Sequence, residues 1–131
     1  MARMTFSGTE EIMEELFREG ERLERKATEM LEAAGEVVTK AWKDVIAEHG
    51  HVDTGDMINS VGSTKIRKEG DAYTSSVYPQ GKDRKKQWNA EKAFVLHYGT
   101  SKIKGDHFVD EAEERGEELA GAAMEQIWMR D

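Results

Sequence analysis

Apolar and small side chains recur every three or four residues across the N-terminal third of the chain. This spacing places them on one face of an amphipathic helix. Thr9 precedes two glutamates, which suits a hydroxyl cap followed by acids that the helix dipole favours in the first turn. The pattern predicts one long helix over residues 9–49, with Gly20 and Gly35 as the points where a kink or break would cost least.

A second amphipathic segment lies in the C-terminal part of the chain. Asp106 can cap its first turn. The apolar side chains of one face follow at Phe108, Ala112, Leu119, Ala123 and Ile127. We therefore expect a C-terminal helix over residues 106–129.

The middle of the chain, residues 50–105, carries strand-like alternation. Residues 61–68 and 72–78 are β-branched or aromatic at intervals and polar in between, with Gly70 between the two arms. This pattern predicts a β-hairpin. Residues 93–98 suit a short helix or a buried strand, because periodicity cannot decide at that length, and we favour the helix.

Together these elements predict an α+β fold in a single domain, residues 1–131. A long N-terminal helix and a C-terminal helix pack on a small antiparallel β-sheet. The chain has 37% hydrophobic and 35% charged residues, a balance that gives a modest core and wide solvated faces. We expect further apolar surface to be buried against neighbouring subunits.

The sequence contains no cysteine, which excludes disulfides, a thiolate nucleophile and a cysteine-based metal site. No apolar run approaches the roughly 20 residues that span a membrane. The N-terminal residues also lack the apolar core of a signal peptide. We therefore expect no membrane partner and a protein that folds in the cytoplasm.

The net charge of −8 is divided unevenly along the chain. Residues 62–105 hold ten Lys/Arg and four Asp/Glu, a net charge of +6. The remaining residues hold nine and twenty-three, a net charge of −14. Such a split bears on docking and association rather than on the fold.

Patterns for catalysis and metal binding are weak in this sequence. Its four histidines are His49, His51, His97 and His107. Their spacing matches no zinc pattern, such as two ligands one helical turn apart, so we expect loop histidines at helix ends. Paired glutamates lie on faces predicted to be solvated, and the serines lack a nucleophile elbow. These observations favour a protein without catalytic residues, metal or cofactor.

A basic segment is the most suggestive cluster of side chains: Lys82, Arg84, Lys85, Lys86 and Trp88. Positive charge beside an aromatic ring is typical of nucleic-acid grooves. The same charges suit an acidic protein surface, such as the helices of a neighbouring copy, or are simply solvated. Because the whole domain is acidic, we favour a protein interface, and a nucleic-acid-binding module using residues 82–88 is the alternative.

Short motifs in this chain resemble those of a known family. The first is Asp53-Thr54-Gly55-x-Met57-x-x-Ser60-Val61. It resembles the Asp-Thr-Gly-x-Leu-x-x-Ser-Ile signature of the small neck proteins of long-tailed bacteriophages. These form the head–tail joining or tail completion family, which also occurs in prophages. In that family the signature follows a long helix and precedes a β-hairpin.

Two later segments resemble the same family in order and spacing. The segment ending in Tyr98-Gly99-Thr100 is similar to its Tyr-Val-Glu-Phe-Gly-Thr segment. The segment from His107-Phe108 is similar to the Pro-Phe-Leu-x-Pro-Ala start of its last helix. The chain departs from the family at His51 and His97, which replace a proline and a glutamate, and it lacks both prolines of the final block.

The resemblance implies a structural virion protein of the phage neck, made in the host cytoplasm, and not an enzyme. It implies a homo-oligomeric ring, a hexamer in the virion. Its partners would be a connector or head-closure protein and a tail terminator or tail tube protein, with DNA passing through the lumen. We expect Phe108 to plug the space between the second motif and the long helix. We expect these residues to form two corners of the fold: Asp53, Thr54, Gly55, Ser60, Tyr98, Gly99, Thr100 and Phe108.

Overall fold

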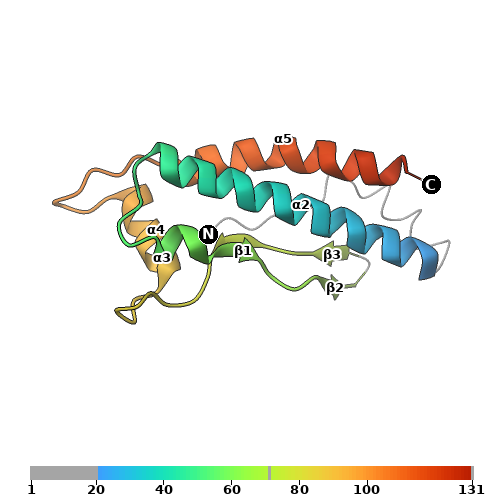
Figure 1. Cartoon of the computed structure of the whole chain (residues 1–131), viewed down its shortest axis with the longest axis horizontal. Helices are drawn as coiled ribbons and strands as arrows, with labels where there is room; N and C mark the ends of the chain where they lie inside the picture. The colour runs from blue at the N-terminus through green and yellow to red at the C-terminus, as the bar shows by residue number, and fades with distance from the viewer. Residues whose placement is uncertain (1–20, 71, 131) are drawn as a thin grey trace.

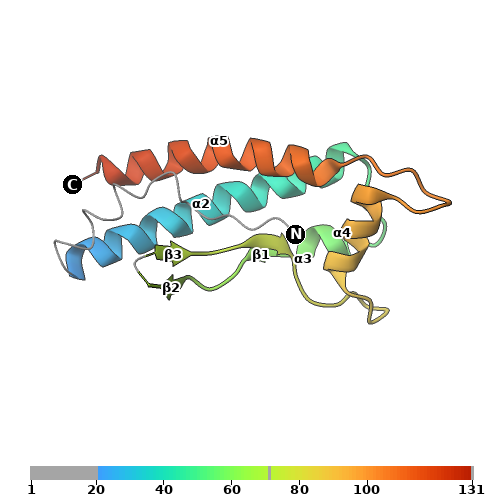
Figure 2. The ribbon, with the colours of Figure 1, turned by 180° about the vertical axis from the view of Figure 1, so that it is seen from behind.

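The computed structural model describes residues 21–70 and 72–130, and its fold is α+β as predicted. Helix α2 (Glu21–Glu48) and helix α5 (Phe108–Trp128) run side by side along the long axis of the molecule (Figure 1). The strands lie along the opposite side of α2, as the reverse view also shows (Figure 2). The predicted helix start at Thr9 and the weak point at Gly20 lie outside the described residues.

The predicted hairpin is present, but it is divided into two short antiparallel pairs. Strand β1 (Val61–Ser63) pairs with β4 (Val77–Pro79), and β2 (Arg67–Glu69) pairs with β3 (Ala72–Thr74). The two pairs form separate two-stranded sheets rather than one continuous ladder.

Side-chain hydrogen bonds join the two pairs where the ladder is interrupted. The Ser75 hydroxyl donates to the Thr64 carbonyl over 2.9 Å, and the Ser76 N–H donates to Thr64 Oγ1 over 3.0 Å. The Thr64 N–H donates to the Ser76 carbonyl over 2.8 Å. Hydroxyl side chains thus satisfy backbone groups that a regular ladder would pair.

Two short helices lie together at one end of the molecule, next to the end of α2 (Figure 1). Helix α3 (Asp56–Ser60) lies within the first motif, and α4 (Asn89–Tyr98) ends in the second. The preference for a helix over a buried strand at residues 93–98 is confirmed.

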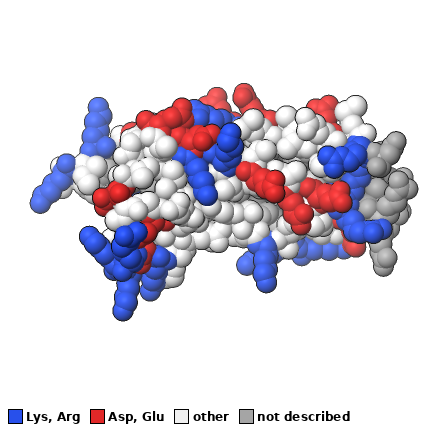
Figure 3. Space-filling model, viewed as in Figure 1, with Lys and Arg blue, Asp and Glu red and all other residues white. Residues whose placement is uncertain are grey.

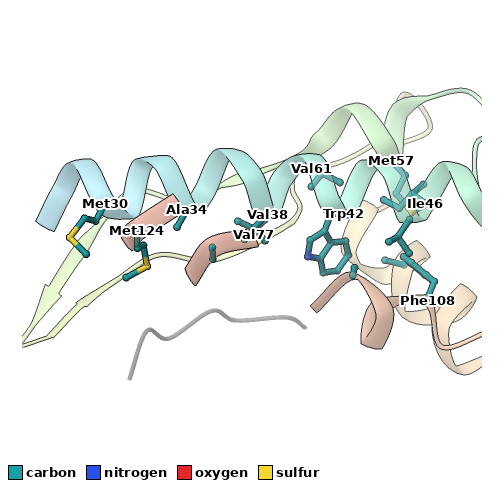
Figure 4. Close-up of a cluster of buried hydrophobic side chains, with 14 of the residues drawn as sticks. Met30, Ala34, Val38, Trp42, Ile46, Met57, Val61, Val77, Phe108 and Met124 are labelled. Atoms are coloured by element: carbon teal, nitrogen blue, oxygen red, sulfur yellow. The ribbon is translucent and has the colours of Figure 1, made fainter. Parts of the chain in front are cut away.

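The core runs along the contact between α2 and α5 and continues under the strands. Trp42 and Phe108 are fully buried, and their rings meet edge to face with centroids 6.2 Å apart. Residues from α2, α3, β1, β4 and α5 converge around this pair (Figure 4). Edge-to-face packing of buried aromatic rings adds to the free energy gained by burying their area.

Glycines set how closely the elements of this core approach. Helix α2 continues through Gly35 without a break, so the predicted weak point is not a kink. A Cβ at Gly35 would lie 3.1 Å from the Cβ of Ser63, and one at Gly116 would lie 3.2 Å from Val38 Cγ1. The missing side chains allow β1 and α5 to pack directly on α2, which offsets the helix-propensity cost of glycine.

The start of α5 differs slightly from the predicted cap. His107, at φ 55 in the left-handed region, is the residue before the helix. Asp106 still serves the first turn, because its Oδ1 accepts a hydrogen bond from the Phe108 N–H over 3.1 Å. The Asp106 carboxylate therefore meets the positive end of the helix dipole.

Candidate assembly surface

The two family-like motifs form corners at the same end of the molecule. We call this the corner end: α3, α4 and the loops at residues 80–88 and 99–107. Both motifs and the basic loop belong to it, although they are far apart in the sequence. Figure 3 shows a group of Lys and Arg side chains there, whereas acidic and basic side chains are interspersed along the helix pair.

The first corner is built by Thr54 and Gly55. Gly55 has φ 88, a left-handed conformation that glycine adopts without a steric penalty. Thr54 Oγ1 accepts from the Asp56 N–H over 3.3 Å, and the Ser60 hydroxyl donates to the Met57 carbonyl over 2.6 Å. These bonds lie where the chain turns from the end of α2 towards β1.

Asp56 in this corner binds Arg84 of the basic loop. Arg84 Nε and Nη2 donate to the two carboxylate oxygens of Asp56 over 2.8 and 2.7 Å, and the Arg84 backbone N–H donates over 3.0 Å. The hydrogen bonds from the Arg84 side chain hold the pKa of the Asp56 carboxyl far below its usual range. This bidentate pair anchors the loop to the corner.

The second corner is a close contact of backbone with backbone. Gly99 has φ 83, and a Cβ there would lie 2.4 Å from the Gly105 nitrogen. Thr100 Oγ1 accepts from the N–H groups of Lys102 and Ile103 over 3.2 and 3.1 Å. Gly99 and Gly105 close the base of this loop, and the Thr100 hydroxyl caps its tip.

Phe108 lies between the second corner and the long helix. Its side chain is fully buried, and its ring centroid lies 6.3 Å from that of His97 in α4 and 5.0 Å from that of His51 beyond α2. Because Phe108 also packs on Trp42, one side chain connects α2, α4 and α5.

The basic loop offers fewer free charges than its sequence indicates. Arg84 is held by Asp56, and Lys82 Nζ lies 4.7 Å from the centroid of the Trp88 ring, a cation–π distance. Within the described residues, Lys85 and Lys86 are exposed and make no side-chain ion pair. Two lysines therefore remain to meet a partner, next to a half-exposed tryptophan.

A pocket of about 210 Å³ opens beside α4. Phe94 and Tyr98 lie at its edge, each 60% exposed, with ring centroids 4.7 Å apart. Asp110 and Glu113 of α5 contribute carboxylates, and burial raises the pKa of Glu113. An aromatic and acidic pocket suits an amphipathic cationic side chain, such as lysine or arginine.

The four histidines form two groups, each beside an aspartate, that their spacing in the sequence did not predict. His49 and His51 converge on Asp106, and His97 and His107 lie near Asp110. No local motif signals the first group, because Asp106 lies more than fifty residues beyond the two histidines in the sequence. Asp53, which is near His49 in sequence, belongs to neither group.

No helix in the described part of the chain is long and apolar enough to cross a membrane. Comparison with protein-family models, curated proteins and solved structures gave no match.

Proposed function

We propose that this protein is a structural subunit of the neck of a tailed bacteriophage, where it assembles as a ring between the connector and the tail. The observation that carries the proposal is the corner end. Motifs that resemble the neck-protein signatures meet there, and they hold a lysine-bearing loop and a pair of exposed aromatic rings in one place. Such a rigid, partly apolar surface is suited to docking.

Contacts between copies follow from the charges. Lys85 and Lys86 of one subunit are complementary to the acidic α5 face of the next, including the pocket with Asp110 and Glu113. This contact joins two different surfaces, so it closes into a ring when the rotation between copies divides a full turn. Six-fold closure is the proposal for the virion.

Disruption of the gene in the phage or prophage that encodes the protein tests this role. We expect filled heads and separate tails that do not join, with joining restored by the wild-type gene. Complementation with the double variant K85E/K86E should fail, whereas K40E, which alters an exposed lysine on α2, should restore joining. Normal particles from the disrupted gene would refute the proposal.

The alternative is a nucleic-acid-binding module. Lys85, Lys86 and the half-exposed Trp88 support it, because charge beside an aromatic face binds single strands. Two free lysines would give a logarithmic salt slope of about −2 on duplex DNA. DNA binding that disappears in K85A/K86A but not in K40A, in a protein without effect on head–tail joining, would favour this alternative.

A further inference from the structure

We propose that His49, His51 and Asp106 bind a divalent transition-metal ion of the zinc class where the end of α2 meets the start of α5. His49 Nδ1 and His51 Nε2 lie at hydrogen-bond distance, 2.9 and 2.5 Å, from the same carboxylate oxygen, Asp106 Oδ2. An ion bound at about 2.0–2.2 Å would move these atoms apart to roughly 3.3 Å. The three potential ligand atoms all lie within 4.8 Å of one another. Two imidazoles and one carboxylate form a donor set that Zn²⁺ and its neighbours favour.

The second nitrogen of His49, Nε2, faces a different carboxylate. His49 Nε2 lies 2.6 Å from Glu111 Oε2, and a carboxylate only accepts, so Nε2 carries the hydrogen. In the neutral ring Nδ1 then has a lone pair, and that lone pair faces the Asp106 oxygen. Two lone pairs at 2.9 Å repel each other unless a cation lies next to both. A metal ion removes that repulsion, and so does a second proton on His49, which the experiment below distinguishes.

The surroundings of His49 resemble an outer ligand shell. Arg115 Nη2 donates to Glu111 Oε1 over 3.0 Å, and Arg115 Nη1 donates to Glu48 over 2.5 Å. Glu111 is thereby held in the orientation that receives the His49 N–H. A carboxylate that accepts from a metal-bound histidine sets its tautomer and raises its ligand strength.

The three side chains are partly exposed to solvent, and the Phe108 ring covers one side of the site. The side chains of His49, His51 and Asp106 are 23%, 15% and 31% exposed. The Phe108 ring packs against His51, and the two imidazoles stack with centroids 6.0 Å apart. Three protein ligands leave a fourth tetrahedral position for water or for a side chain of another molecule.

The second histidine group lacks a free lone pair and provides a control. His97 Nδ1 accepts from the Val109 N–H over 3.2 Å, so the hydrogen of its neutral ring is on Nε2. Nε2 is the atom that faces Asp110, at 4.0 Å. A metal bound to His97 Nε2 would require the hydrogen of the neutral ring to be on Nδ1. That hydrogen would then point at the N–H of Val109. His107, which is exposed, is therefore the matched control residue.

The test uses the untagged full chain, treated with a chelator and then titrated with Zn²⁺ and with Co²⁺. We expect one ion per chain by calorimetry, and Co²⁺ absorption bands of a four-coordinate site that Zn²⁺ removes. H51Q should weaken Zn²⁺ binding by at least about tenfold, E111Q by about 10- to 100-fold, and H107Q should leave it unchanged. Because metal binds only the folded chain, Zn²⁺ should raise the melting temperature of the wild type but not of H51Q.

Three outcomes would overturn the assignment. The first is the absence of stoichiometric Zn²⁺ binding by the wild type. The second is equal loss of binding in H51Q and H107Q, which would place the ion elsewhere. The third is imidazole ¹⁵N spectra in which His49 carries two hydrogens and does not respond to Zn²⁺. A metal-free melting curve of H51Q that matches the wild type would show that the variant folds, so its loss of binding would be local.

Discussion

Single side chains and single glycines hold the corner end together. Phe108 is the buried residue that α2, α4 and α5 share, and Gly99 is the position where two segments of backbone touch. Neither role comes from helix or strand propensity. Both can be tested by removing or adding a few atoms.

The substitution F108A should destabilise the protein by about 3–5 kcal/mol, the usual cost of deleting a fully buried aromatic ring. The cavity would lie between Trp42 and His51. Chemical denaturation measures the difference. The control L119A, on the exposed face of α5, should change the free energy of unfolding by less than about 0.5 kcal/mol. Equal effects of the two variants would contradict the role of Phe108.

The substitution G99A should destabilise more than G81A does, although both glycines have positive φ. A Cβ at Gly99 would lie 2.4 Å from the Gly105 nitrogen and 2.5 Å from the Ile103 oxygen, whereas nothing lies within 4 Å of one at Gly81. G81A measures the backbone strain alone, about 1 kcal/mol. The difference between the unfolding curves of the two variants gives the cost of the close contact together with that of the Gly99 backbone, which has φ 83 and ψ 178. Equal losses would show that the second corner tolerates a side chain.

Among the elements, the basic loop depends on its contact with α3. The Asp56–Arg84 pair includes a backbone N–H, so it orders the loop as well as neutralising one charge. The variant D56A should therefore speed tryptic cleavage after Lys85 and Lys86 and raise the amide hydrogen exchange of Arg84. D53A, which changes an exposed carboxylate in the same corner, is the control. Unchanged exchange at Arg84 in D56A would refute the anchoring role.

The pH dependence of this contact follows from the lowered pKa of Asp56. A carboxyl with a lowered folded pKa stabilises fully above its ordinary value of 3.8 and loses that contribution only as the pH falls through the lowered value. Protection of the Arg84 amide should therefore persist to about pH 4 and be lost in stronger acid. Loss of protection between pH 7 and 5, after correction for intrinsic exchange, would contradict the pair.

The long helices and the hairpin could be predicted from the sequence, because each depends on local periodicity. Periodicity alone could not distinguish the short helix α4 from a buried strand. The break in the hairpin at Thr64 could not, since hydroxyl side chains take over its backbone hydrogen bonds. Gly35 was predicted to be a weak point in the helix. In the structure it allows β1 to pack closely on α2, a contact that depends on tertiary structure.

The candidate surface was predictable only in part. The identity of the basic loop and the two corners could be read from residue types. The pairing of Arg84 with Asp56 could not be predicted, because the partners are distant in sequence, one at the start of α3 and the other in a loop without a pattern. The convergence of His49 and His51 on Asp106 depends on how α5 returns along α2, which spacing does not encode.

On the scale of the whole molecule, a group of basic side chains lies at the corner end, and acidic and basic side chains are interspersed along the helix pair (Figure 3). If copies join through these surfaces, raising the salt concentration should weaken self-association, since the screening length falls from about 10 Å at 0.1 M to about 3 Å at 1 M. Analytical ultracentrifugation measures this effect. K85E/K86E should dissociate at low salt, while K40E should behave as the wild type. Association that does not respond to salt would contradict the charge pairing.

The closed base of the loop between Gly99 and Gly105 makes its tip independent of the rest of the chain. Ser101 and Lys102 at the tip are exposed, and lengthening an exposed loop costs little extra closure entropy. A short peptide epitope inserted between these two residues would separate Thr100 from the Lys102 N–H but should leave the close contact of Gly99 with Gly105 in place. Antibodies or gold particles that bind this epitope would then mark the position of each subunit in an assembled particle.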